Sequence, residues 1–164
     1  MEFIKRQRVG AWVTLGVALM TIAAIIVYCV SSTAAGYFRN TLSGAVVTFG
    51  VLAAILLLGA VALAQLEVGG TAGKCIKVAA DVMRVGATLL LIASLLMFVS
   101  QRVEGLAYIF GSNEDVSAEV QTPENLASAR MAIAGFIVYG ITWLLTLAST
   151  FFPIALKPNN GEQI

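Results

Sequence analysis

The 164-residue chain contains no histidine, and only 12% of its residues are charged. Without an imidazole, the sequence offers no histidine ligand for haem or zinc and no histidine acid–base catalyst. The four-span topology predicted from the apolar blocks below places the two cysteines, Cys29 and Cys75, on opposite sides of a membrane, whereas a disulfide requires Cα atoms within about 7 Å. We therefore expect no intrachain disulfide, no metal, no cofactor and no catalytic residue, and we predict that the protein is not an enzyme.

The few charges also nearly cancel, because the formal net charge is +1. The basic residues are scattered, and they form no dense cluster of the kind that binds phosphates. Nucleic acid is therefore not an expected partner.

Apolar residues are in excess, at 59% of the chain, whereas soluble domains average about 45–50%. They are gathered in long blocks without alternation, and within lipid only a helix satisfies its own backbone in one segment. These blocks predict an all-α polytopic membrane protein, a single domain over residues 1–164, with four transmembrane helices in an antiparallel bundle surrounded by lipid. The predicted spans cover residues 9–30, 42–66, 79–101 and 130–153.

The distribution of lysine and arginine predicts the orientation, since basic residues near helix ends favour the cytoplasmic side. Lys5, Arg6 and Arg8 precede the first span, whereas the first loop carries only Arg39. We therefore predict cytoplasmic N- and C-termini and an outer loop over residues 102–129.

Local helix signals refine the ends of the last two spans. Residues 103–110 are amphipathic, and they either extend the third helix to Gly111 or lie flat at the interface. Thr122 and Pro123 are typical of an N-cap and a first helical position, which starts the fourth helix well before its apolar block. The last two helices are thus expected to project outside, joined by residues 112–121.

Glycines mark the connection between the second and third spans. Gly69 and Gly70 predict a helix end, and Thr71 predicts the N-cap of a third helix that begins near Ala72.

Two sets of residues are candidates for contact with other helices or proteins. Asp81 and Arg84 lie within reach of each other on one helix face, where they either fix the helix at the interface or contact a partner subunit. The acidic residues of the outer loop lack the spacing of a calcium loop and are expected to form a solvated, partner-facing cap. The candidate partner contacts are Asp81, Arg84, Glu114, Asp115, Glu119 and Arg130, and the candidate helix-packing residues are Gly50, Ala54, Gly135 and Gly140.

The middle of every span is uncharged, whereas functional ionisable groups of transporters lie at that depth. Hydroxyl groups are the main polar side chains there, and we expect them to bond within or between helices. The sequence therefore predicts a non-catalytic accessory or scaffold subunit that binds another membrane protein or itself. The alternative is a component of an oligomeric transporter or channel for ions or small solutes, and a lipid-modifying enzyme is a third interpretation.

Overall fold

Helices make up all the regular structure that a computed structural model describes in residues 9–66 and 70–154. The helices are α2 (Val9–Thr33), α3 (Gly44–Ala64), α4 (Gly70–Gly111), α5 (Glu114–Val120) and α6 (Pro123–Ser149). All except α5 are long and apolar enough to cross a membrane. The predicted all-α membrane protein with four spans is confirmed.

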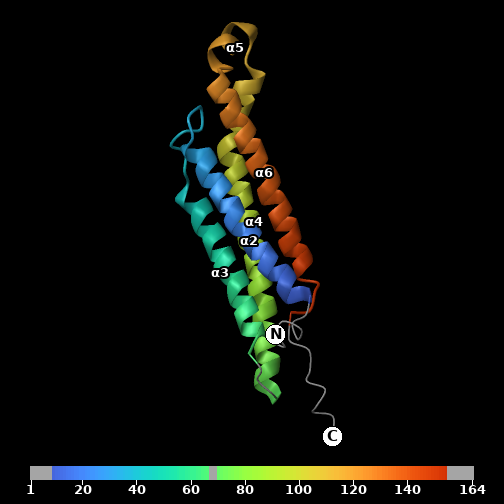
Figure 1. The fold of residues 1–164 in the computed structure, drawn as a ribbon. Helices are drawn as coiled ribbons and strands as arrows, with labels where there is room; N and C mark the ends of the chain where they lie inside the picture. Colours follow the sequence, from blue (N-terminus) through green and yellow to red (C-terminus); the bar gives the residue numbers. More distant parts are fainter. Residues whose placement is uncertain (1–8, 67–69, 155–164) are drawn as a thin grey trace.

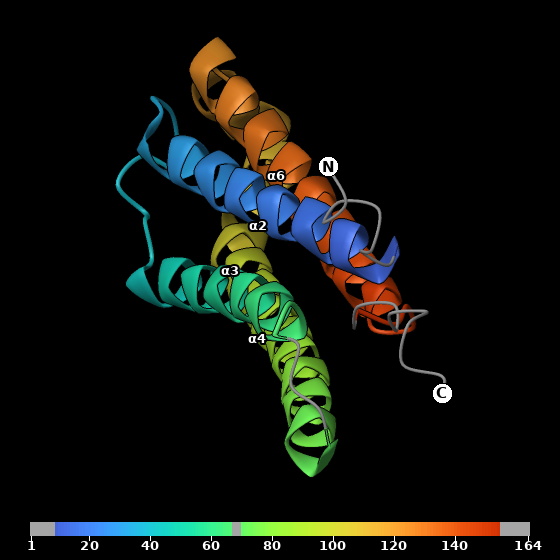
Figure 2. The same ribbon diagram turned by 60° about the horizontal axis from the view of Figure 1, so that its bottom comes forward.

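The four long helices form an elongated bundle (Figure 1). Seen from a second direction, α2 lies beside α6, and α3 lies beside α4 (Figure 2). α2 also packs against α3, and α4 also packs against α6, so each long helix packs mainly against two others. Successive long helices cross in opposite directions, and these four packed pairs are therefore antiparallel, as predicted.

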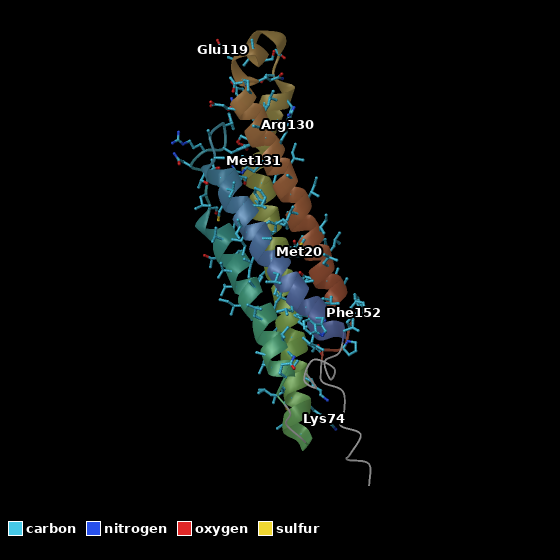
Figure 3. All side chains as sticks on the ribbon, in the orientation of Figure 1. Met20, Lys74, Glu119, Arg130, Met131 and Phe152 are labelled. Atoms are coloured by element: carbon cyan, nitrogen blue, oxygen red, sulfur yellow. The ribbon has the colours of Figure 1, made fainter. Side chains whose placement is uncertain are left out.

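The two ends of the bundle differ in what they carry. One end carries α5, and we call residues 103–129, which surround it, the head. The other, terminal end carries the first residue of α2 and the last residue of α6. Glu119 and Lys74 mark these two ends (Figure 3). The free cysteines lie apart along the bundle, with Cys29 on α2 and Cys75 near the start of α4.

α4 is the longest helix, with 42 residues. It is about 63 Å long, roughly twice the thickness of the hydrocarbon layer, so the predicted span 79–101 is only its central part. Its predicted extension to Gly111 is confirmed, and the alternative of an interfacial segment is wrong. The predicted cap at Thr71 is also wrong, because α3 already ends at Ala64 and α4 begins at Gly70.

The start of α6 agrees with the sequence. Thr122 is the N-cap, its Oγ1 accepts a hydrogen bond from the Asn125 backbone N–H at 3.2 Å, and Pro123 is the first helical residue. The joining segment 112–121 was expected to be a loop, but it contains the short helix α5. Gly69 and the basic residues Lys5, Arg6, Arg8 and Lys157 lie outside the described residues, and the cytoplasmic placement of the termini stays a prediction.

Aromatic rings fill the core of the bundle toward the head. The Phe98 ring packs edge-on against Tyr28 and Phe136, with ring centroids 4.8 Å apart in both pairs, and lies 6.0 Å from Tyr139. Large aliphatic side chains on the other faces point outward on every long helix, among them Leu19, Ile55, Leu89 and Ile137. This distribution suits a bundle whose outer surface meets lipid tails.

Candidate functional site

Two buried arginines face the interior of the bundle from α4. Arg84 is 1% exposed and Arg102 is 0% exposed. They are 18 residues apart, which is about five full turns, so both lie on the same face of the helix about 27 Å from each other. This separation is close to the roughly 30 Å thickness of the hydrocarbon layer. Each guanidinium therefore lies near one border of the apolar part of the bundle.

Arg102 holds the connection between α2 and α3, residues 34–43. Its Nη1 donates to the Phe38 carbonyl at 3.4 Å and to Thr41 Oγ1, and its Nη2 donates to Ser32 Oγ at 2.6 Å. The guanidinium carbon also lies 4.5 Å from the Phe38 ring centroid and 5.8 Å from that of Phe98. Neutral oxygens and aromatic faces thus surround this buried charge.

The same connection packs closely against the head. Gly36 has φ +117°, and a Cβ there would lie 2.7 Å from the Ser128 Cβ on α6. The Phe38 backbone N–H donates to Ser128 Oγ at 3.4 Å. A Cβ on Gly105 of α4 would lie 2.6 Å from the Tyr37 ring. Gly36 on the connection and Gly105 on α4 therefore let the connection approach both α4 and α6.

A tyrosine adds a second link at this level. The Tyr28 hydroxyl donates to Gln101 Oε1 at 3.3 Å and accepts from the Ser43 backbone N–H at 2.7 Å. It joins α2, α4 and the residue that precedes α3.

Arg84 holds the chain that follows α6 at the terminal end. Its Nη1 donates to Asp81 Oδ1 at 3.2 Å and to the Phe152 carbonyl at 3.1 Å. The Asp81 side chain is 63% exposed, so the pair has one buried and one solvated member. A Cβ on Gly10 of α2 would overlap the Pro153 carbonyl. The predicted contact between Asp81 and Arg84 is thus present, and the arginine binds its own chain.

A smaller polar cluster lies midway between the arginines. Ser94 Oγ donates to the Val46 carbonyl at 2.9 Å and shares a hydrogen bond of 3.0 Å with the Tyr139 hydroxyl. A Cβ on Gly50 would lie 2.8 Å from that hydroxyl and 2.8 Å from Ile25 Cγ1. The cluster links α3, α4 and α6 and depends on the close approach at Gly50.

The remaining packing candidates have different surroundings. Ala54 is buried, and a Cβ on Gly135 would lie 2.9 Å from the Phe98 ring. A Cβ on Gly140 would meet no atom within 4 Å, so this glycine makes no close contact within the described chain. The other buried hydroxyls of the spans bond back to their own helices, among them Thr14, Thr21, Thr142 and Thr146.

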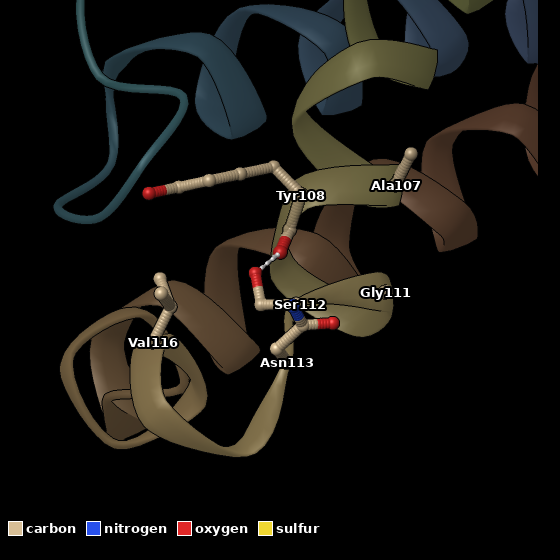
Figure 4. A pocket seen from close by; sticks show the side chains of 6 residues that line it. All are labelled: Ala107, Tyr108, Gly111, Ser112, Asn113 and Val116. Atoms are coloured by element: carbon tan, nitrogen blue, oxygen red, sulfur yellow. Dashed lines mark hydrogen bonds between the residues drawn. The ribbon is translucent and has the colours of Figure 1, made fainter.

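The head and the adjoining α2–α3 connection carry exposed apolar and aromatic side chains beside a shallow hollow. Tyr37, Tyr108, Phe110 and Val116 are all substantially exposed. The hollow has a volume of about 310 Å³ and lies where α4 meets α5 (Figure 4). Tyr108 extends from it toward the α2–α3 connection, and its ring centroid lies 6.0 Å from that of Tyr37. The residues that line the hollow are Ala107, Tyr108, Gly111, Ser112, Asn113 and Val116.

The predicted partner contacts do not form one site. Asp81 and Arg84 lie at the terminal end, whereas Glu119 and Arg130 are exposed in or next to the head. Glu114 and Asp115 belong to α5, but their side chains lie outside the described part of the structure.

The role of Arg102 escaped the sequence analysis, which placed this residue only at the start of the outer loop. Its spacing of 18 residues from Arg84 was the available signal, because whole turns place both residues on one helix face.

The chain matches no protein-family model, no curated protein and no solved structure.

Proposed function

We propose that the protein is a non-catalytic accessory or scaffold subunit that binds another membrane protein through its head. The observation that carries this proposal is the exposure of Tyr37, Tyr108, Phe110 and Val116 on a part of the molecule beyond the central span. Aromatic residues are enriched at the centres of protein interfaces, where they contribute much of the binding energy.

The head is built as a firm support for these side chains. Phe38, Ile109, Val120 and Ala129 pack together in a small core of their own. The Gln121 side chain donates to the Ile109 carbonyl at 3.1 Å. A surface that is ordered before binding loses less conformational entropy on association, which favours a docking role.

The centre of the bundle is consistent with a structural role. Ser94 and Tyr139 bond to each other, and rings of Phe98 and Tyr28 fill the space beside them. The threonines of the spans spend their hydroxyls on their own helices. A single copy thus uses its buried polar groups to hold helices together.

Photocrosslinking in intact membranes tests the docking role. A benzophenone amino acid is placed at Tyr108 or Val116 in the head, and at Leu144 on the outward face of α6 as a control of similar exposure. We expect one protein adduct of defined mass from both head positions and none from Leu144. The double variant Tyr37→Ala, Tyr108→Ala should reduce the adduct formed from Val116.

Two outcomes would contradict the proposal. Adducts with lipid alone at the head would indicate an aromatic anchor at the membrane interface. A solute flux through liposomes that contain only this protein, above that of empty liposomes, would favour the transporter or channel.

A further inference from the structure

The outward face of α4 carries a heptad repeat of apolar residues along most of its length. From Cys75 onward these residues follow at alternating intervals of three and four, and seven of the eleven are more than half exposed. We call this row the α4 seam. Its residues are Cys75, Val78, Val82, Val85, Leu89, Ile92, Leu96, Val99, Val103, Leu106 and Phe110.

The length of the seam matters more than its apolar character. Any span exposes apolar side chains to lipid, but the seam is about 50 Å long and the hydrocarbon layer only about 30 Å thick. Val78 and Val82 lie before Arg84, and Val103 and Phe110 lie after Arg102, so both ends of the seam extend past the apolar layer. An apolar surface that continues beyond the lipid tails is typical of a site of protein contact.

A row of small residues accompanies the seam. One small residue directly follows every second seam residue, at a constant spacing of seven, and one more at the same spacing precedes the seam. Such residues allow two helix backbones to approach closely within a membrane. They are Ala72, Ala79, Gly86, Ala93, Ser100 and Ala107. Neither this row nor the seam contains a charged residue.

We propose that a second copy of the chain covers the α4 seam, with the two α4 helices parallel and in register. A second copy in the same membrane has the same orientation, so its α4 has the same length and lies at the same depth. It therefore covers both ends of the seam at once. A symmetric pair places each residue near its own equivalent, which would make any charge repulsive, and the seam has none.

The two apolar surfaces have different occupants. The head surface around Tyr37 and Val116 takes another protein in the proposed function, whereas the seam takes a copy of this chain. The two surfaces meet at Phe110, which belongs to both, whereas Tyr37, Tyr108 and Val116 are not part of the seam. The head association is probed at Tyr108 and Val116, and the seam pairing at Cys75 and Val103, so either association can fail in an experiment while the other is observed.

Cysteine crosslinking in membranes tests the pairing at its two ends. The parallel register brings Cys75, which is exposed and free, next to its equivalent in the other copy. Copper(II)–phenanthroline in air is the oxidant, accepting two electrons as two thiols lose their protons and form a disulfide. The full-length Cys29→Ser protein should give a reducible species of twice 17.2 kDa. Val103→Cys in a background without Cys29 and Cys75 should do the same.

Matched controls carry the thiol on other exposed faces of α4. Lys77→Cys lies two residues after Cys75, about 200° around the helix, and Glu104→Cys directly follows Val103, about 100° around it. Because a disulfide needs Cα atoms within about 7 Å, each control should crosslink at least about tenfold more slowly than its seam position. Equal rates at seam and control positions, or crosslinking at only one end of the seam, would overturn the proposal. The head photocrosslink is unaffected by either result.

Discussion

Replacing Arg102 by methionine should release the α2–α3 connection from the head while the four-helix bundle stays folded. The substitution removes three hydrogen bonds from a charged donor to Ser32, Phe38 and Thr41, and two contacts with aromatic faces. Bonds to a charged group each contribute about 1.5–3 kcal/mol net. Methionine keeps much of the apolar volume, so the loss falls mainly on these polar contacts.

Removal of the buried charge offsets part of this loss, because a buried ion carries a desolvation cost of several kcal/mol. The net destabilisation of the connection should be about 3 kcal/mol. Since about 1.4 kcal/mol corresponds to a factor of ten, the connection should open about 100-fold more often.

Hydrogen exchange measured by mass spectrometry reports this opening. Peptides covering residues 34–43 should exchange about 100-fold faster in Arg102→Met, and those covering residues 150–154 should be unchanged. Arg130→Met is the matched control, because Arg130 is exposed on α6. Arg102→Lys should give an intermediate rate, since an ammonium cannot reproduce the planar, forked contacts. Equal exchange rates over residues 34–43 in the two methionine variants would show that Arg102 does not hold the α2–α3 connection.

Three further predictions follow from other contacts. Arg84→Met should accelerate hydrogen exchange only over residues 150–154, whereas Asp81→Asn should change it little, because exposed pairs contribute below about 1 kcal/mol; equal effects would contradict the assignment. Gly50→Val should lower the thermal unfolding temperature in detergent by overpacking worth about 1–3 kcal/mol, whereas Gly140→Ala should be neutral or stabilising; a matched loss in both would refute the close approach. Tyr139→Phe should cost about 0.6–1.7 kcal/mol in the same assay, and no change would show that its hydroxyl adds nothing.

The spans and their antiparallel order could be read from the sequence because lipid imposes one strong requirement, a helical backbone with apolar side chains. The start of α6 was readable for a local reason, since Thr122 and Pro123 act within one turn. The start of α4 was not readable, because the sequence analysis took Gly70 as the end of a helix, whereas α4 begins there.

The contacts of the two buried arginines could be predicted only in part. Asp81 and Arg84 are close in sequence, and their contact follows from helix geometry alone. The partners of Arg102 come from a different helix and from an irregular connection 61 to 70 residues away in the chain. Such a contact depends on how the chain folds back, which residue types and spacing do not reveal.

The common face of the two arginines has a mechanical consequence. The spacing of five full turns places both guanidinium groups on one face of α4. The helix contains no proline that would kink it between the two arginines. A rotation of α4 that draws Arg102 away from the α2–α3 connection therefore draws Arg84 away from the Phe152 carbonyl in the same direction. The two contacts therefore respond together to a rotation of α4, although they lie near opposite ends of the bundle.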